Sequence, residues 1–116
     1  MELPNAQFAL VGRAKLTEYL LNPAHPENGG KAAFFASLGF QRDGWAVLAA
    51  ALRQMALELP VAKSMETAHG DKYVLDGALA GPSGKAQHVR TIWIIDRGSE
   101  APRFVTAYPG APMTQI

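Results

Sequence analysis

The chain has 116 residues, a formal net charge of +1 and no cysteine. A chain of this length can bury one hydrophobic core, so we expect a single domain over residues 1–116, with its core at about residues 6–108 and a flexible tail at residues 109–116. The absence of cysteine excludes disulfides, thiolate metal ligands and cysteine nucleophiles. The small net charge excludes a strongly basic protein that coats nucleic acid, so any contact with phosphate must be local.

Hydropathy predicts neither a membrane segment nor a secretory signal. Hydrophobic residues make up 48% of the chain and charged residues 18%, as in an ordinary globular domain. No apolar run approaches the roughly 18 residues that a membrane-spanning helix needs. The first five residues lack the basic region and apolar core of a secretory signal, so a signal for export would have to lie elsewhere.

Three stretches in the N-terminal half repeat apolar residues at helical spacing. The first ends before Pro23, because the residue preceding a proline avoids the helical conformation. The second begins at Gly30 or Lys31, and the third has Asp43 as its N-cap. The predicted helices are residues 13–21, residues 31–38 and residues 44–59.

From Val61 onward apolar and polar residues alternate, and turns that contain glycine separate the alternating stretches. The predicted strands are residues 62–68, 72–80, 86–95 and 103–108. Short turns imply that neighbouring strands pair antiparallel in chain order. The sequence therefore predicts an α+β domain in which three N-terminal helices pack on one face of a four-stranded antiparallel meander sheet.

The third predicted strand has two different sides. Val89, Thr91, Trp93 and Ile95 alternate with the second set, His88, Arg90, Ile92 and Ile94. We expect the first set to face the helices and the second set to face away from them.

The pairing of the last two strands decides which polar groups share the second side. If Ile95 pairs with Arg103, Trp93 lies opposite Val105 on the helix side. The same register places Arg90 opposite Tyr108, and Ile92 opposite Thr106, on the other side. A slip of one residue would send Thr106 and Tyr108 to the face opposite Arg90, so the proposed grouping depends on this register.

The loop from His25 to Lys31 offers the most concentrated chemistry in the chain. It combines an imidazole that titrates near neutrality, a flexible turn at Gly30 with backbone N–H donors, and the positive charge of Lys31. Those groups suit a phosphate site. If the loop overhangs the sheet face that carries Arg90, the two parts of the sequence form one concavity.

Such a set fits cleavage of RNA without a metal, in which the 2′-hydroxyl attacks the phosphorus and the 5′-oxygen leaves. His25 would transfer protons, Lys31 and Arg90 would stabilise the charge on the phosphorane, and Thr106 and Tyr108 would orient the phosphate or the sugar. These five residues are the candidate catalytic set. His88 and Gly30 are candidate substrate-binding residues, and His88 is also a plausible second acid or base.

Each candidate also has a structural explanation. A histidine before proline, such as His25, fits a hydrogen-bonded surface group, and Lys31 fits a solvated helix start. Arg90 within an apolar strand needs either a carboxylate partner such as Asp76 or a ligand. Thr106 and Tyr108 can be explained by strand propensity alone, because threonine and tyrosine are common in β-strands.

Motifs for metals and nucleotides are missing from the sequence. The three histidines lack metal-ligand spacing, and no carboxylate cluster suits Mg²⁺. The pair Gly30–Lys31 lacks both the earlier glycine and the following hydroxyl residue of a nucleotide-binding phosphate loop. We therefore expect no metal and no cofactor, while a transferase or cyclase on a similar scaffold stays open.

The order of several motifs carries a family resemblance. These are LTEYLLNPAHP, GKAAFFASLGF, KYVLDGALAGPSGKA, VRTIWII and PRFVTAYP. Together, over about residues 3–109, the chain resembles a family of small bacterial domains of unknown function, often encoded beside an antitoxin-like partner or fused to the C-terminus of larger toxin proteins. It is also similar to the broader group of barnase, EndoU, colicin and RelE toxin ribonucleases.

The resemblance implies a metal-independent toxin endoribonuclease that acts on RNA such as tRNA. It implies the same five catalytic positions and adds Thr91 as a substrate-binding position, although strand alternation buries Thr91. It also implies an RNA substrate, a cognate antitoxin or immunity protein, and action in the cytoplasm, with delivery as the C-terminal domain of a larger exported protein. The alternative is a non-catalytic binding or immunity module from the same kind of locus.

Overall fold

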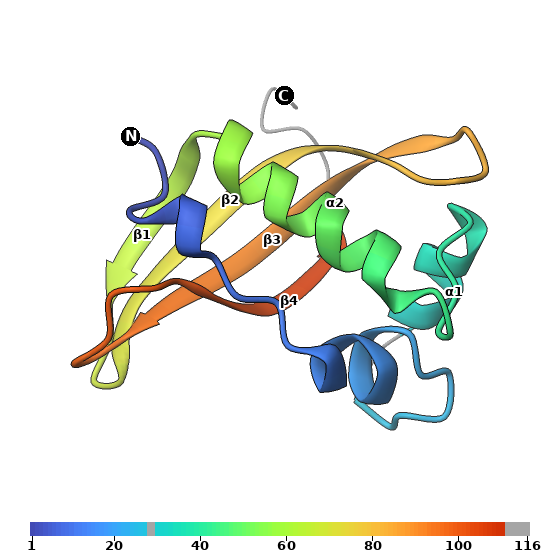
Figure 1. The fold of residues 1–116 in the computed structure, drawn as a ribbon, viewed down its shortest axis with the longest axis horizontal. Helices are drawn as coiled ribbons and strands as arrows, with labels where there is room; N and C mark the ends of the chain where they lie inside the picture. Colours follow the sequence, from blue (N-terminus) through green and yellow to red (C-terminus); the bar gives the residue numbers. More distant parts are fainter. Residues whose placement is uncertain (28–29, 111–116) are drawn as a thin grey trace.

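The computed structural model describes residues 1–27 and 30–110 (Figure 1). Two parts of the predictions therefore lie outside the described residues. They are the Asn28–Gly29 part of the loop between His25 and Lys31, and residues 111–116 of the predicted tail.

Four strands form a single antiparallel sheet in the order β1-β2-β3-β4. Their bounds are Val61–Glu66, Gly70–Ala80, Ala86–Asp96 and Arg103–Pro109. The bounds agree with the predicted strands to within two residues at each end, because period-two alternation and glycine turns mark strands clearly. Hydrogen bonding continues one residue past β4, where the Gly110 N–H donates to the His88 carbonyl over 3.1 Å. The predicted end of pairing at Tyr108 is therefore slightly too early.

The predicted layer of three N-terminal helices is wrong. The helical elements are the 3₁₀ turn η1 (Ala6–Phe8), the π-helical segment η2 (Lys15–Leu20), the seven-residue α1 (Lys31–Ser37) and the 14-residue α2 (Trp45–Glu58). Figure 1 shows α2 lying across one face of the sheet, with α1 and η2 near its N-terminal end. One long helix and several short segments therefore cover this face.

Helix α2 supplies the main contact with the sheet. Its buried residues include Leu48, Leu52 and Met55, which join one hydrophobic core with Val89 and Trp93 of β3. Burying each large apolar side chain contributes roughly 1.5–3 kcal/mol, so this interface holds the two layers together. The N-cap of α2 is Gly44, with no side-chain cap bond, so the prediction of Asp43 as the cap is wrong.

Helix α1 is fixed at its C-terminal end. Gly39 adopts a left-handed φ of 97°, and the N–H groups of Gly39 and Phe40 donate to the carbonyls of Ala36 and Phe35. The Leu38 carbonyl also accepts a hydrogen bond of 3.0 Å from the Ser83 N–H in the turn between β2 and β3. This anchoring to the sheet sets the position of Lys31 at the other end of the helix.

A β-bulge shifts half of the pairing between β3 and β4. Arg90 lies opposite Tyr108 and Ile92 opposite Thr106, as predicted. Trp93, however, pairs with Phe104, so Val105 is an extra residue and the predicted partner of Trp93 is wrong. Both Trp93 and Phe104 are buried and stack edge to face at 5.4 Å, which satisfies the core on the helix side.

Candidate active site

Tyr19 connects the N-terminal half of the chain to the last strand. Its phenolic oxygen lies 3.1 Å from the hydroxyl of Thr106, although the two residues are 87 positions apart. Tyr19 is half-buried on η2, which contacts the edge strand β4. The expected meeting of N-terminal groups with the polar residues of β4 therefore takes place through this tyrosine.

Two lysines lie against the Tyr19 ring. The ammonium of Lys31 is 5.5 Å from the ring centroid and that of Lys15 is 5.6 Å away. Burial raises the pKa of the Tyr19 phenol, but hydrogen bonds with Thr106 and Lys31 and the charges of both lysines outweigh it. The net effect lowers the pKa of Tyr19 below that of an ordinary tyrosine.

His25 contacts the same ring from the loop. Its imidazole meets Tyr19 edge to face, with centroids 5.1 Å apart. The Glu27 N–H donates to His25 Nδ1 over 3.1 Å, so the neutral ring carries its proton on Nε2. The side chain of Asn22 holds this loop by accepting from the Ala24 N–H and donating to the Glu18 carbonyl. His25 is therefore oriented as a donor through Nε2.

These contacts define one group, which we call the Tyr19 cluster. Its members are Lys15, Tyr19, His25, Lys31 and Thr106. Sequence reasoning found three of the five and missed Tyr19 and Lys15. Tyr19 lies within the helix predicted for residues 13–21, where helical spacing groups it with Leu16 and Leu20. A π-type bond from the Leu21 N–H to the Leu16 carbonyl, 2.8 Å long, instead widens this turn. The spacing of four residues between Lys15 and Tyr19 was the available signal.

A second polar group, the Arg90 row, crosses the sheet through Asp76, Arg90 and Tyr108. The guanidinium of Arg90 donates to both oxygens of Asp76, at 2.7 and 3.1 Å. The hydrogen bond with Asp76 and its negative charge raise the pKa of Arg90, and Tyr108 adds a smaller hydrogen bond. Arg90 thus has the carboxylate partner that its place in an apolar strand required.

The two groups are neighbours on β4. Thr106 and Tyr108 pair with Ile92 and Arg90, so both lie on the sheet face away from α2. Residues two apart on a strand are separated by about 7 Å. The structure therefore brings His25, Lys31 and Thr106 together around Tyr19 and places Arg90 and Tyr108 beside them.

The three predicted substrate-binding residues are not members of the Tyr19 cluster. Thr91 is fully buried on the helix side, where its hydroxyl donates to the Leu75 carbonyl and accepts from Trp93 Nε1, so it belongs to the core. His88 is half-buried at the end of β3, and its Nε2 atom has no partner among the described residues. Gly30 is an exposed residue with a φ of 83° directly before Lys31.

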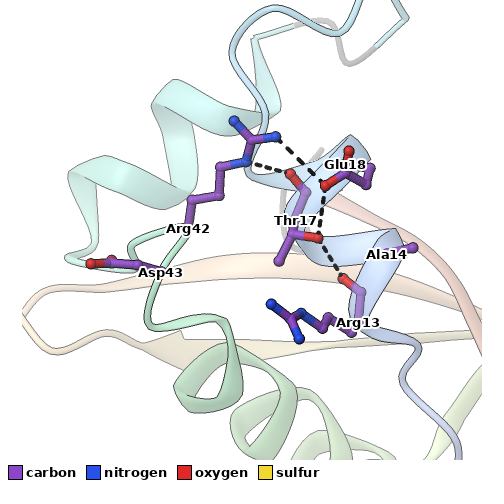
Figure 2. A pocket seen from close by; sticks show the side chains of 6 residues that line it. All are labelled: Arg13, Ala14, Thr17, Glu18, Arg42 and Asp43. Atoms are coloured by element: carbon purple, nitrogen blue, oxygen red, sulfur yellow. Dashed lines mark hydrogen bonds and ion pairs between the residues drawn. The ribbon is translucent and has the colours of Figure 1, made fainter.

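Two hollows lie near these groups. A groove of about 480 Å³ on the open sheet face is lined by residues that include Lys63, Lys72 and Ile92, and it reaches all three members of the Arg90 row. Figure 2 shows another hollow, of about 780 Å³, beside η2. Two of its charged groups are paired, because Arg42 contacts Glu18 at 3.7 Å, and Arg42 also donates to the Thr17 carbonyl at 2.6 Å. We regard this second hollow as support for η2, since these bonds fix the residues adjacent to Tyr19.

The described residues contain neither a candidate metal site nor a candidate membrane-spanning helix. Residues 1–27 and 30–110 contain no group of three or more histidine or acidic side chains that could hold a metal ion. In the same residues, no helix combines the length and the apolar character needed to cross a membrane.

Fold and site together define a small α+β domain with a phenol, two ammonium groups and an imidazole gathered at the edge strand. By sequence, residues 2–111 match a family described as a domain of unknown function, DUF6883, and the chain belongs to that family. None of the curated proteins is similar enough in sequence to add a relative.

Similarity to a solved structure is also found at the level of the fold. That structure is a chain from the contact-dependent growth inhibition toxin–immunity protein complex from Klebsiella pneumoniae 342. The TM-score is 0.70 at 21% sequence identity, and the match covers 87% of this chain and 99% of that chain. At this level of identity the likeness establishes a common fold.

Proposed function

We propose that this domain is a toxin-type endoribonuclease that cleaves RNA, such as tRNA, by transesterification without a metal. The observation that carries the proposal is the hydrogen bond between Tyr19 and Thr106, with Lys31 and His25 against the same ring. It joins η2 to the hydroxyl of Thr106 on β4, while His25 of the loop and Lys31 of α1 contact the Tyr19 ring. Positive charge, hydrogen-bond donors and titrating groups thus surround one point, which is what a phosphorane requires.

Each member of the site has a proposed role in binding the scissile phosphate. Lys31 stabilises the negative charge that develops on the phosphorane, and the Nε2–H of His25 donates to a phosphate oxygen or to the departing oxygen. Thr106 and Tyr108 orient the phosphate and the ribose. Arg90 acts mainly by holding Tyr108, because Asp76 neutralises much of its charge.

The fold comparison supports a toxin context. The similar chain comes from a complex between a toxin and its immunity protein. A toxin ribonuclease would have a cognate antitoxin or immunity protein, and its target RNA would be in the cytoplasm of the affected cell. We propose that the domain reaches that compartment as the C-terminal part of a larger exported protein.

Incubation of total RNA with the purified domain in EDTA tests the activity. We expect cleavage by the wild type and at least a hundredfold slower cleavage by His25→Ala, since acid–base groups contribute about 10²–10⁴-fold. His69→Ala is the matched control, because His69 is exposed in the turn between β1 and β2. Intact RNA in the presence of folded wild-type protein would rule out the nuclease.

The second candidate function is a non-catalytic immunity module. It is favoured by the same comparison, because the solved complex contains an immunity protein as well as a toxin. Expression in bacteria separates the two functions. A toxin should slow growth, and a co-expressed cognate partner should restore it, whereas an immunity module should be harmless alone and protect cells from its toxin.

A further inference from the structure

Tyr19 makes more contacts than a residue that only helps to bind phosphate would need. Its hydroxyl is the point at which η2, α1 and β4 meet, through contacts with Lys31 and Thr106. A residue that served only to pin η2 to the sheet would need one hydrogen bond and no positive charges. Two ammonium groups beside a phenol favour its deprotonated form.

We propose that the phenolic oxygen of Tyr19 is the proton acceptor for the attacking 2′-hydroxyl of the RNA. This inference rests on the proposed ribonuclease function. The 2′-oxygen gives its proton to the Tyr19 phenolate as it bonds to phosphorus, and the bond from phosphorus to the 5′-oxygen breaks. The 5′-oxygen, which accepts a hydrogen bond from the His25 Nε2–H, takes a proton from water. This leaves a 2′,3′-cyclic phosphate and a 5′-hydroxyl, and Tyr19 later returns its proton to water.

The other candidates for the acceptor are less suited. The lone pair of His25 Nδ1 already accepts from the Glu27 N–H, and its Nε2 carries the proton in the neutral ring. Three carboxylates are held by arginines, since Glu18 pairs with Arg42, Asp76 with Arg90 and Asp96 with Arg103. The side chains that shift the pKa of Tyr19 are Thr106, Lys31 and Lys15 rather than a carboxylate. Tyr19 is then the group best placed to accept a proton.

The charged and titrating groups around Tyr19 come from three segments. They are Lys15 on its own segment, Lys31 on α1 and His25 in the loop, while β4 contributes the uncharged hydroxyl of Thr106. The two lysines lower the pKa of Tyr19 and thus enlarge the fraction of phenolate near neutral pH. Replacing Lys31 by a neutral residue should therefore raise that pKa.

The first experiment measures the rate of RNA cleavage against pH for the wild type and for Tyr19→Phe. The wild-type rate should rise with pH and level off at the pKa of Tyr19, and Tyr19→Phe should lose about 10²–10⁴-fold together with that rise. Tyr73→Phe removes a hydroxyl from a buried tyrosine on the α2 side of the sheet and should behave as the wild type. Circular dichroism establishes that each variant is folded.

The second experiment follows tyrosinate directly by ultraviolet absorbance. Subtracting the titration of Tyr19→Phe from that of the wild type isolates Tyr19. In Lys31→Gln the Tyr19 transition should move to higher pH and the plateau of the cleavage rate should move with it. Lys31→Arg keeps the charge and should keep both transitions near their wild-type positions.

The outcomes separate this inference from the function on which it rests. Wild-type rates in Tyr19→Phe would overturn the inference and leave the nuclease intact. A slow Tyr19→Phe that kept the wild-type pH profile would also overturn it, since Tyr19 would then only position other groups. Absence of cleavage by the wild type, with a normal tyrosinate titration, would end both proposals.

Discussion

The Tyr19 cluster and the Arg90 row sit side by side on β4, yet their charges are balanced differently. In the Arg90 row the guanidinium forms two hydrogen bonds to Asp76, whose side chain is only 10% exposed. In the Tyr19 cluster neither Lys15 nor Lys31 belongs to an ion pair among the described residues, and both face an aromatic ring. One group has its own counter-ion, whereas the other suits an anionic ligand.

This difference in charge balance suggests that one group supports the fold and the other binds a ligand. An ion pair that is made within the fold contributes to the fold and leaves less charge for a ligand. Cations gathered without a carboxylate repel one another and therefore cost some stability, which a bound phosphate would recover. We expect variants of the Tyr19 cluster to change activity and variants of the Asp76–Arg90 ion pair to change stability.

Among the variants that test this comparison, Lys31→Ala should have the largest effect. Removing one charged donor to the phosphorane should lower the cleavage rate about 10²–10³-fold. The free energy of unfolding should change by less than about 0.5 kcal/mol, because Lys31 makes no ion pair within the described part of the chain. Rates on a labelled RNA and urea unfolding measure the two quantities. Lys85→Ala, an exposed lysine beside the turn between β2 and β3, is the control.

Asp76→Ala tests whether the ion pair of the Arg90 row supports the fold. It leaves the guanidinium of Arg90, which is 28% exposed, without its carboxylate, and should cost about 2 kcal/mol of unfolding free energy. The double variant Asp76→Leu with Arg90→Leu should recover most of that loss, because it removes both charges together. Urea unfolding of the single and double variants measures this. An unchanged stability in Asp76→Ala would mean that the row does not support the fold.

Two threonines on neighbouring strands give a matched pair. Thr91→Val removes the acceptor of the buried Trp93 Nε1–H and should cost about 1–2 kcal/mol of stability without changing cleavage. Thr106→Val removes the partner of the Tyr19 hydroxyl and should slow cleavage about fivefold with little change in stability. If Thr91→Val and Thr106→Val changed the cleavage rate equally, or the stability equally, the two threonines would not have the different roles proposed here.

The smallest effect is expected from an exposed ion pair that lies far along β3 from the site. The hydrogen bond from Arg103 lowers the pKa of Asp96 in the folded state, so its stabilisation is present above the unfolded pKa and is lost as pH falls through the folded pKa. The melting temperatures of the wild type and Asp96→Asn should therefore differ slightly near neutral pH and converge below about pH 4. A difference that persisted in acid would assign the effect to something other than the charge.

Parts of the site could be predicted from the sequence because they depend on local periodicity. Alternation along residues 86–95 put Arg90 on the face away from the helices. The predicted pairing of Arg90 with Tyr108 is correct, although it rested on a pairing of Ile95 with Arg103, and Arg103 pairs with Ile94 instead. The same reasoning failed at Val105, because a bulge adds a residue without any signal in the hydrophobic pattern. It also failed for the helical layer, since helical spacing does not tell a π-turn from an α-helix.

The sequence by itself therefore determined the four strands and helix α2, and it identified His25 and Lys31 as candidate site residues. Only the tertiary structure decided which of these residues meet. Asp76 meets Arg90 because the two residues are paired across β2 and β3. Tyr19 reaches Thr106 across 87 positions because η2 packs against β4. No local pattern encodes such a contact, and it is this contact that places Tyr19, rather than His25, at the centre of the site.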